Sequence, residues 1–129
     1  MFVDASVLVA ILLEEGDAAE LSARIEKSER RLTSPISVYE AALALSRVHS
    51  KSVADAESRV RQLVRLARIP IEPVVDQTAS LALEAHAKFG KGPHPARLNM
   101  GDCFAYAMAK QHGVPLLYKG EDFSQTDLA

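Results

Sequence analysis

Four carboxylates stand where expected strands end or expected helices begin. They are Asp4, Glu40, Asp102 and Asp122. Carboxylate oxygens are hard ligands, typical of Mg²⁺ and Mn²⁺ sites in proteins. The four histidines and the single cysteine show no spacing typical of zinc ligands. The residue types therefore predict a site for Mg²⁺, with Mn²⁺ as the alternative.

Asp4 makes the strongest physical case for a bound cation. It follows the apolar residues 1–3 and precedes the apolar run 7–13, so we expect its carboxylate to be half buried. A buried charge needs a partner. The first Lys or Arg in the chain is Arg24, so no cation is close in sequence. A divalent metal ion is the economical partner.

The other three acids each have an ordinary structural explanation as well. Asp102 lies three residues after Asn99, where an acid stabilises a helix N-terminus by ~0.3–1 kcal/mol. Glu40 also lies near an expected helix start, although its neighbours are apolar or small. Asp122 lies in a turn, where acids are common, and Glu121 beside it competes for the same role.

Strand and helix patterns alternate along the chain. Two helices fill each interval between successive strands, an order that predicts a parallel sheet covered by helices on both faces. The expected strands are residues 1–3, 31–35, 69–75 and 114–118.

Short polar residues mark where the expected helices begin. Residues 89–99 contain two glycines and two prolines, so they are expected to form a loop. The expected helix caps are Asp17, Ser37, Ser52, Asp76 and Asn99.

The four acids are expected to meet at one edge of this sheet. Ligands of open parallel sheets bind beyond the carboxyl ends of the strands. Asp4 ends the first strand, and Asp122 follows the last. Glu40 and Asp102 lie in the first turns of two helices, and helix starts occupy the same edge.

Cations gather in two segments that could hold a phosphate backbone near these acids. The loop from His86 to Arg97 contains Lys88, Lys91 and Arg97 but no acid. The alternative is an ordinary loop and a solvated helix face. The second segment contains Arg47, Lys51, Arg59, Arg61, Arg65 and Arg68.

The composition excludes several classes of protein. With 129 residues, 48 % of them apolar, we expect one domain over residues 1–129 with a substantial core. A net charge of −2 excludes a globally basic nucleic-acid binder, and the absence of Trp argues against a base-stacking platform. Cys103 is the single cysteine, so no intrachain disulfide is possible. No signal peptide or membrane span is expected, which makes the cytoplasm the expected location.

Four blocks of sequence together resemble one family. They are FVDAS at residues 2–6, SVYEAA at 37–42, LNMGDCFAYA at 98–107 and LLYKGEDF at 116–123. In this order, and in a chain of this size, they resemble PIN-domain ribonucleases, specifically the VapC-like toxins of type II toxin–antitoxin pairs. The third block is the most specific, and the resemblance runs the full length of the chain.

This resemblance implies an α/β fold, a PIN-like three-layer sandwich with a central parallel sheet of four to five strands flanked by helices. It also implies Mg²⁺-dependent endoribonuclease activity, a cognate antitoxin and a homodimer. Asp4 and Asp102 match the principal metal ligands, while Glu40 and Asp122 match the other two acids. The candidate substrate-binding residues are Ser6, Asn99, Lys91 and Arg97.

Two other functions deserve comparison. A receiver-like signalling domain would need a phosphoacceptor, for which Asp76 is the candidate, and Lys119 would serve as its lysine. A catalytically inactive PIN-like binding protein would lack the intact set of acids. A phosphatase of the DxD type is excluded because Ser6 stands two residues after Asp4.

Overall fold

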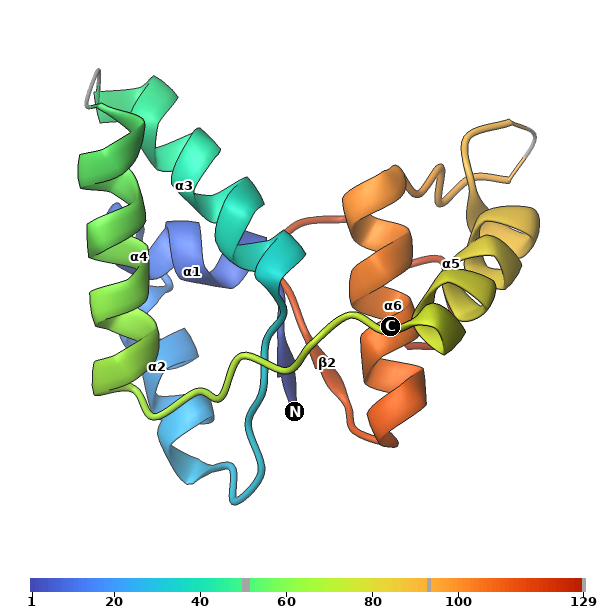
Figure 1. The fold of residues 1–129 in the computed structure, drawn as a ribbon, viewed down its shortest axis with the longest axis horizontal. Helices are drawn as coiled ribbons and strands as arrows, with labels where there is room; N and C mark the ends of the chain where they lie inside the picture. The colour runs from blue at the N-terminus through green and yellow to red at the C-terminus, as the bar shows by residue number, and fades with distance from the viewer. Residues whose placement is uncertain (50–51, 93, 129) are drawn as a thin grey trace.

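Two short parallel strands lie between two groups of helices (Figure 1). The computed structural model describes residues 1–49, 52–92 and 94–128, which contain two strands and six helices. Strand β1 (Phe2–Val3) pairs with β2 (Leu116–Leu117). The helices are α1 (Ala5–Leu12), α2 (Ala18–Lys27), α3 (Pro35–His49), α4 (Val53–Leu66), α5 (Asp76–Phe89) and α6 (Met100–His112).

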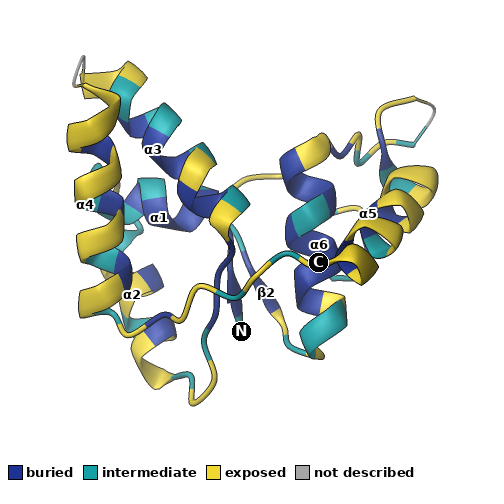
Figure 2. Cartoon of the chain, in the orientation of Figure 1, coloured by how far each residue is buried: buried dark blue, intermediate teal, exposed yellow. Residues whose placement is uncertain are grey.

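The strands are buried on both faces, which explains why they read as continuous apolar runs. Phe2 and Leu116 pack in the core with α5 and α6. Val3 and Leu117 pack in a second core with α1 to α4. Figure 2 shows the buried strands between the two helical layers. The predicted arrangement of helices on both faces of a parallel sheet is therefore confirmed.

The regular sheet is narrower than the predicted four to five strands, which are not confirmed. Leu32 and Thr33 form single parallel bridges, with Phe2 and Ile71 respectively. The backbone N–H of Thr33 donates to the carbonyl of Pro70 at 2.9 Å. Pro35 follows the segment of Leu32 and Thr33, and prolines stand on both sides of Ile71. Because proline has no N–H to donate, neither segment extends into a regular strand.

Two of the expected helix caps are confirmed. The Ser52 hydroxyl accepts from the Asp55 N–H at 3.0 Å, and Asn99 caps α6. Ser37 is not a cap, because α3 already begins at Pro35, a residue favoured at the first helical position. The hydroxyl of Ser34 accepts the N–H of Ser37 instead.

Asp17 does occupy the expected N-cap position, although without a cap bond, whereas the expectation for Asp76 is wrong. Asp17 precedes α2, but its carboxylate accepts from the Lys119 ammonium group and makes no cap bond. Asp76 is the first residue of α5 rather than its cap, and Thr78 accepts the Val75 N–H at 3.1 Å. Among the described helices, none is long and apolar enough to cross a membrane.

Candidate active site

Asp4 leaves β1 and caps α1 at the same time. The residue is only 6 % exposed. Ser6 donates twice to the same oxygen, Oδ2, from its backbone N–H at 3.1 Å and from its hydroxyl at 2.6 Å. The Ser6 hydroxyl also accepts the backbone N–H of Lys119 at 2.9 Å, just after β2. The ends of both strands are therefore tied to the Asp4 carboxylate.

Asp102 lies in the first turn of α6 and is 8 % exposed. Its N–H donates to Asn99 Oδ1 at 2.9 Å, while the Asn99 N–H donates to Asp102 Oδ2 at 3.2 Å. This reciprocal capping box fixes the carboxylate near the helix start. The ordinary structural explanation for Asp102 is therefore correct, and Asp122 also forms a side-chain hydrogen bond with this carboxyl group.

Glu40 reaches the same region from α3, and its carboxylate lies against Gly101 in α6. Asp122 lies in the turn after β2 and is exposed. The charge of Asp122 acts on Asp4, Glu40 and Asp102, whereas Glu121 contributes to none of their titrations. The electrostatic interactions thus favour Asp122 over Glu121 as a neighbour of the other three acids.

Burial and mutual repulsion raise the pKa values of Asp4, Glu40 and Asp102. Loss of hydration raises the pKa of Glu40 to about 7, and the charges of Asp4 and Asp122 add to the effect. Burial also raises the pKa of Asp102 to about 7, again with contributions from Asp122 and Asp4. The pKa of Asp4 is raised chiefly by burial, against the lowering effect of its bonds from Ser6. The cluster therefore holds protons near neutral pH unless a cation neutralises it.

No Lys or Arg among the described residues forms an ion pair with these four acids. Lys119 follows β2 closely, but its ammonium group pairs with Glu15 and Asp17, each at 3.0 Å. The four carboxylates are neighbours rather than a closed ligand set. Within the part of the chain that the structure describes, no three His, Cys, Asp or Glu side chains stand close enough to hold a metal ion as placed.

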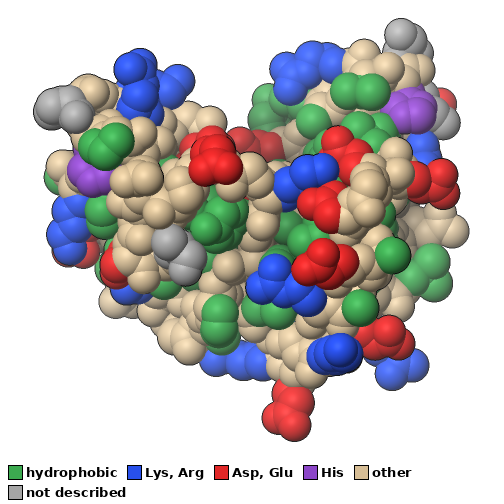
Figure 3. All heavy atoms as spheres, turned by 180° about the vertical axis from the view of Figure 1, so that it is seen from behind, with side chains coloured by type: hydrophobic (Ala, Val, Ile, Leu, Met, Phe, Trp, Pro, Cys, Tyr) green, Lys and Arg blue, Asp and Glu red, His purple; other side chains and the backbone are tan. Residues whose placement is uncertain are grey.

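The surface is hollowed between two helical lobes, one formed by α1 to α4 and the other by α5 and α6. Figure 3 shows Asp and Glu side chains at the floor of this hollow, with Lys and Arg side chains on both rims. The exposed Lys91 and Arg97 belong to the loop before α6, and Arg47 belongs to the last turn of α3. An acidic floor with basic rims suits a phosphate backbone that crosses a metal site.

The structure gives the predicted substrate-binding residues different positions. Ser6 uses its hydroxyl on Asp4 and Lys119, so it positions the acid. Asn99 is exposed and lies close to Asp102 in the chain. Lys91 and Asn99 both line a second pocket. Arg97 is exposed in a left-handed backbone conformation, with φ of 51°.

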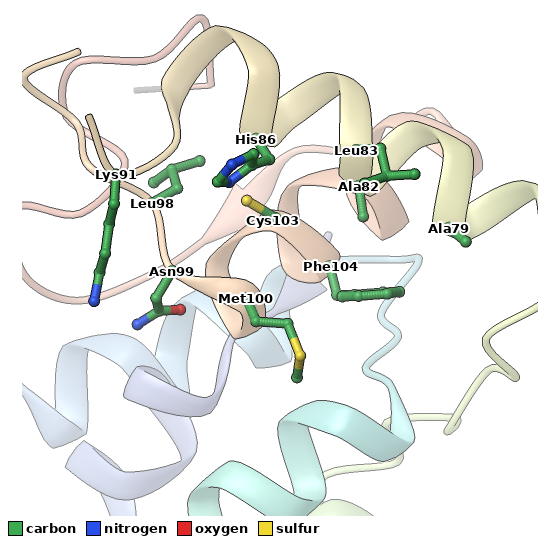
Figure 4. A pocket seen from close by; sticks show the side chains of 10 residues that line it. All are labelled: Ala79, Ala82, Leu83, His86, Lys91, Leu98, Asn99, Met100, Cys103 and Phe104. Atoms are coloured by element: carbon green, nitrogen blue, oxygen red, sulfur yellow. The ribbon is translucent and has the colours of Figure 1, made fainter. Parts of the chain in front are cut away.

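The pocket that Lys91 lines is separate from the acidic hollow. It lies between α5 and α6 and has a volume of about 560 Å³ (Figure 4). Most of its lining residues are apolar. Leu83 and Met100, each 68 % exposed, belong to it. Cys103 is buried, as expected for a small hydrophobic residue, and the His86 ring points toward it.

The basic segment of α4 is partly neutralised. Arg61 donates to Glu57 at 2.6 Å one turn away on the exposed helix face. Arg59 is half buried, and Arg65 and Arg68 are exposed. This pattern favours the solvated helix face over a phosphate-binding surface. Lys51 lies outside the described residues.

Two contributors to the site were missed from sequence. Gly101 provides the space that Glu40 occupies. A glycine inside the first turn of an expected helix could have indicated this close approach. The backbone N–H of Lys119 donates to the Ser6 hydroxyl. The type of residue at position 119 does not predict this bond, because a backbone group makes it. The receiver-like alternative does not fit, because Asp76 starts α5 and the Lys119 ammonium group is engaged by Glu15 and Asp17.

Comparison with known proteins places the chain in a family. A sequence profile of the PIN domain matches residues 1–128. A VapC ribonuclease of Rhizobium meliloti is 42 % identical over 139 residues, covering 98 % of both chains. Ribonucleases VapC30 and VapC28 of Mycobacterium tuberculosis are 40 % and 39 % identical, over 100 % and 98 % of this chain and 96 % and 93 % of their own. The chain therefore belongs to the PIN domain family and groups with the VapC ribonucleases, as the four sequence blocks predicted.

Proposed function

We propose that this protein is a metal-dependent endoribonuclease that hydrolyses RNA phosphodiester bonds, with Mg²⁺ as the cofactor and Mn²⁺ as the alternative. The observation that carries this proposal is the convergence of Asp4, Glu40, Asp102 and Asp122 from four segments, without a protein cation among the described residues. Relatives about 40 % identical that are named ribonucleases support RNA as the substrate.

The donor set suits a hard divalent cation. Asp4 and Asp102 are buried carboxylates that lack a charged partner among the described residues, and both would act as principal ligands. Glu40 and Asp122 would complete the set. A bound divalent ion would activate a water molecule and neutralise charge on the phosphate and the leaving oxygen.

The protein's own groups would do the remaining work. The capping box holds Asp102, and Ser6 holds Asp4, so these carboxylates are in place before substrate arrives. In the alternative arrangement, the three aspartates hold the ion and Glu40 instead orients the attacking water. Lys91 and Arg97, both exposed, would bind flanking phosphates.

The direct test is cleavage of RNA by the purified protein with and without Mg²⁺. We expect Asp4→Asn and Asp102→Asn to stay folded but to lose cleavage. If wild-type protein binds RNA and fails to cut it under any divalent ion, the catalytically inactive PIN-like alternative is favoured.

We further propose that the protein is the toxin of a type II pair and that a cognate antitoxin neutralises it. A partner Arg or Lys could pair with the acidic floor of the hollow. Apolar surface on α3 and α4 is available for a partner helix, since Tyr39 is 65 % exposed and Val53 is 55 % exposed. Co-expression with the adjacent small reading frame should give a stable complex without RNase activity. Undiminished cleavage in the presence of excess partner would contradict this assignment.

A homodimer in the cytoplasm completes the proposal. The mostly apolar pocket between α5 and α6, with Leu83 and Met100 exposed, supports self-association. Light scattering on the purified protein should give twice the chain mass of 14.0 kDa. A concentration-independent monomer would contradict a dimer.

A further inference from the structure

Gly101 occupies a position at which any side chain would collide with Glu40. It is the second residue of α6 and is buried. A Cβ atom built on Gly101 overlaps both oxygens and the Cδ atom of the Glu40 carboxyl group, its three nearest neighbours. The carboxylate of one helical lobe thus fills the space left by a missing side chain in the other.

The backbone does not explain why this residue is glycine. Gly113 and Gly120 have positive φ values, 63° and 100°, which disfavour other residues. Gly101 is not among the residues with positive φ, and it lies within a helix. Glycine inside a helix costs ~1 kcal/mol relative to alanine. The reason for this glycine must therefore be space, and the space is occupied by Glu40.

We propose that Gly101 is a positioning residue for the active site, because its missing side chain admits the Glu40 carboxylate to the first turn of α6, the turn that carries Asp102. Its catalytic consequence rests on the proposed ribonuclease function. Glu40 extends from α3, and the charges of Asp4 and Asp122 both act on it there. Any side chain at position 101 would push this carboxylate out of the cluster.

The substitution Gly101→Ala should separate stability from activity. The colliding atoms are the end of a flexible side chain, so Glu40 can swing away without unfolding the helices. The fold should be retained, and α6 should gain the higher helix propensity of alanine. A displaced Glu40 would leave the reacting groups misaligned, and a misplacement of about 1 Å costs up to ~100-fold in rate.

The experiment compares Gly101→Ala with Gly16→Ala, each alone and with Glu40→Ala. Gly16 is a matched control because its Cβ position meets nothing within 4 Å and its φ is not positive. We expect Gly101→Ala to lower kcat by about 10- to 100-fold with KM little changed, and Gly16→Ala to have no effect. In the Glu40→Ala background, Gly101→Ala should have no further effect on kcat.

Two measurements on the metal-free protein make the test independent of catalysis. Nuclear Overhauser contacts between the Glu40 side chain and α6 should be present in wild type and lost in Gly101→Ala, while the melting temperature stays the same or rises. Retained contacts would overturn the inference even if the wild-type protein cuts no RNA. So would a drop in kcat of equal size in the Glu40→Ala background. If contacts are lost as expected but wild type shows no cleavage, only the proposed function fails.

Discussion

The Ser6 hydroxyl donates a 2.6 Å hydrogen bond to Oδ2 of Asp4 while it accepts a bond from the backbone of Lys119. One side chain thus connects the carboxyl ends of β1 and β2 to the most deeply buried acid of the site. The same hydroxyl matched a substrate-binding position in the sequence, but its proton is donated inside the protein, to Asp4.

Ser6→Ala should therefore loosen Asp4 rather than weaken RNA binding. We expect kcat to fall by roughly 10-fold, KM to stay nearly constant, and the free energy of unfolding to fall by about 1 kcal/mol, the typical value of one hydrogen bond. Steady-state cleavage assays and urea titration measure both quantities. Ser22→Ala, at an exposed position of α2, is the control. A change confined to KM would indicate that Ser6 contacts substrate instead.

The stability of the metal-free protein should fall as pH rises from about 4 to about 7. Folding raises the pKa of Asp102 from 3.8 to about 7, so in this range the folded state binds a proton that the unfolded state has lost. Stability from this group is complete below pH 4 and disappears as pH passes 7. Urea titrations at several pH values, with EDTA, measure the trend.

Asp102→Asn should remove much of this pH dependence. At pH 8 without metal we expect it to be more stable than wild type by about 1–2 kcal/mol, less than the full shift implies because solvent screens the site. Asp55→Asn, at an exposed acid in α4, should not be stabilised in this way. Mg²⁺ should stabilise wild type only. Parallel curves for wild type and Asp102→Asn would count against a repulsive acid cluster.

Most of the helical layout and the two paired strands could be predicted from sequence, whereas the width of the sheet could not. The caps Ser52 and Asn99 are read correctly because their side chains bond to the backbone three residues ahead. Asp17 occupies the cap position without a cap bond, because a distant residue, Lys119, takes its carboxylate. The outer strands are overpredicted because their apolar patterns were given more weight than the prolines they contain, which interrupt a regular ladder.

The candidate site could be predicted as a set of acids but not as a geometry. Asp4 stands out because an acid between two apolar runs must be buried, and the structure confirms its burial. Asp122 and Glu121 are indistinguishable in sequence, because the choice depends on which side chain turns toward Asp102. The space that Gly101 gives to Glu40 depends on how the two lobes pack, which no local pattern contains.

Lys91 and Arg97 should contribute electrostatically to RNA binding. Replacing both by Gln should weaken binding of a single-stranded RNA and reduce the slope of log K against log salt by about 0.7 for each lost phosphate contact. Arg24→Gln combined with Lys27→Gln, both at exposed positions of α2, is the control with an equal change of charge. Fluorescence anisotropy with catalytically inactive Asp102→Asn protein measures binding without cleavage. An unchanged salt slope would exclude both residues from the RNA path.

The central claim is that these carboxylates hold the metal ion that cleaves RNA. Its most direct test is isothermal titration of Mg²⁺ into wild-type and Asp4→Asn protein, with RNA cleavage assayed on the same samples. We predict that wild type binds Mg²⁺ and cuts RNA, that EDTA abolishes cleavage, and that folded Asp4→Asn does neither. Wild-type metal affinity and cleavage in folded Asp4→Asn protein would contradict the account.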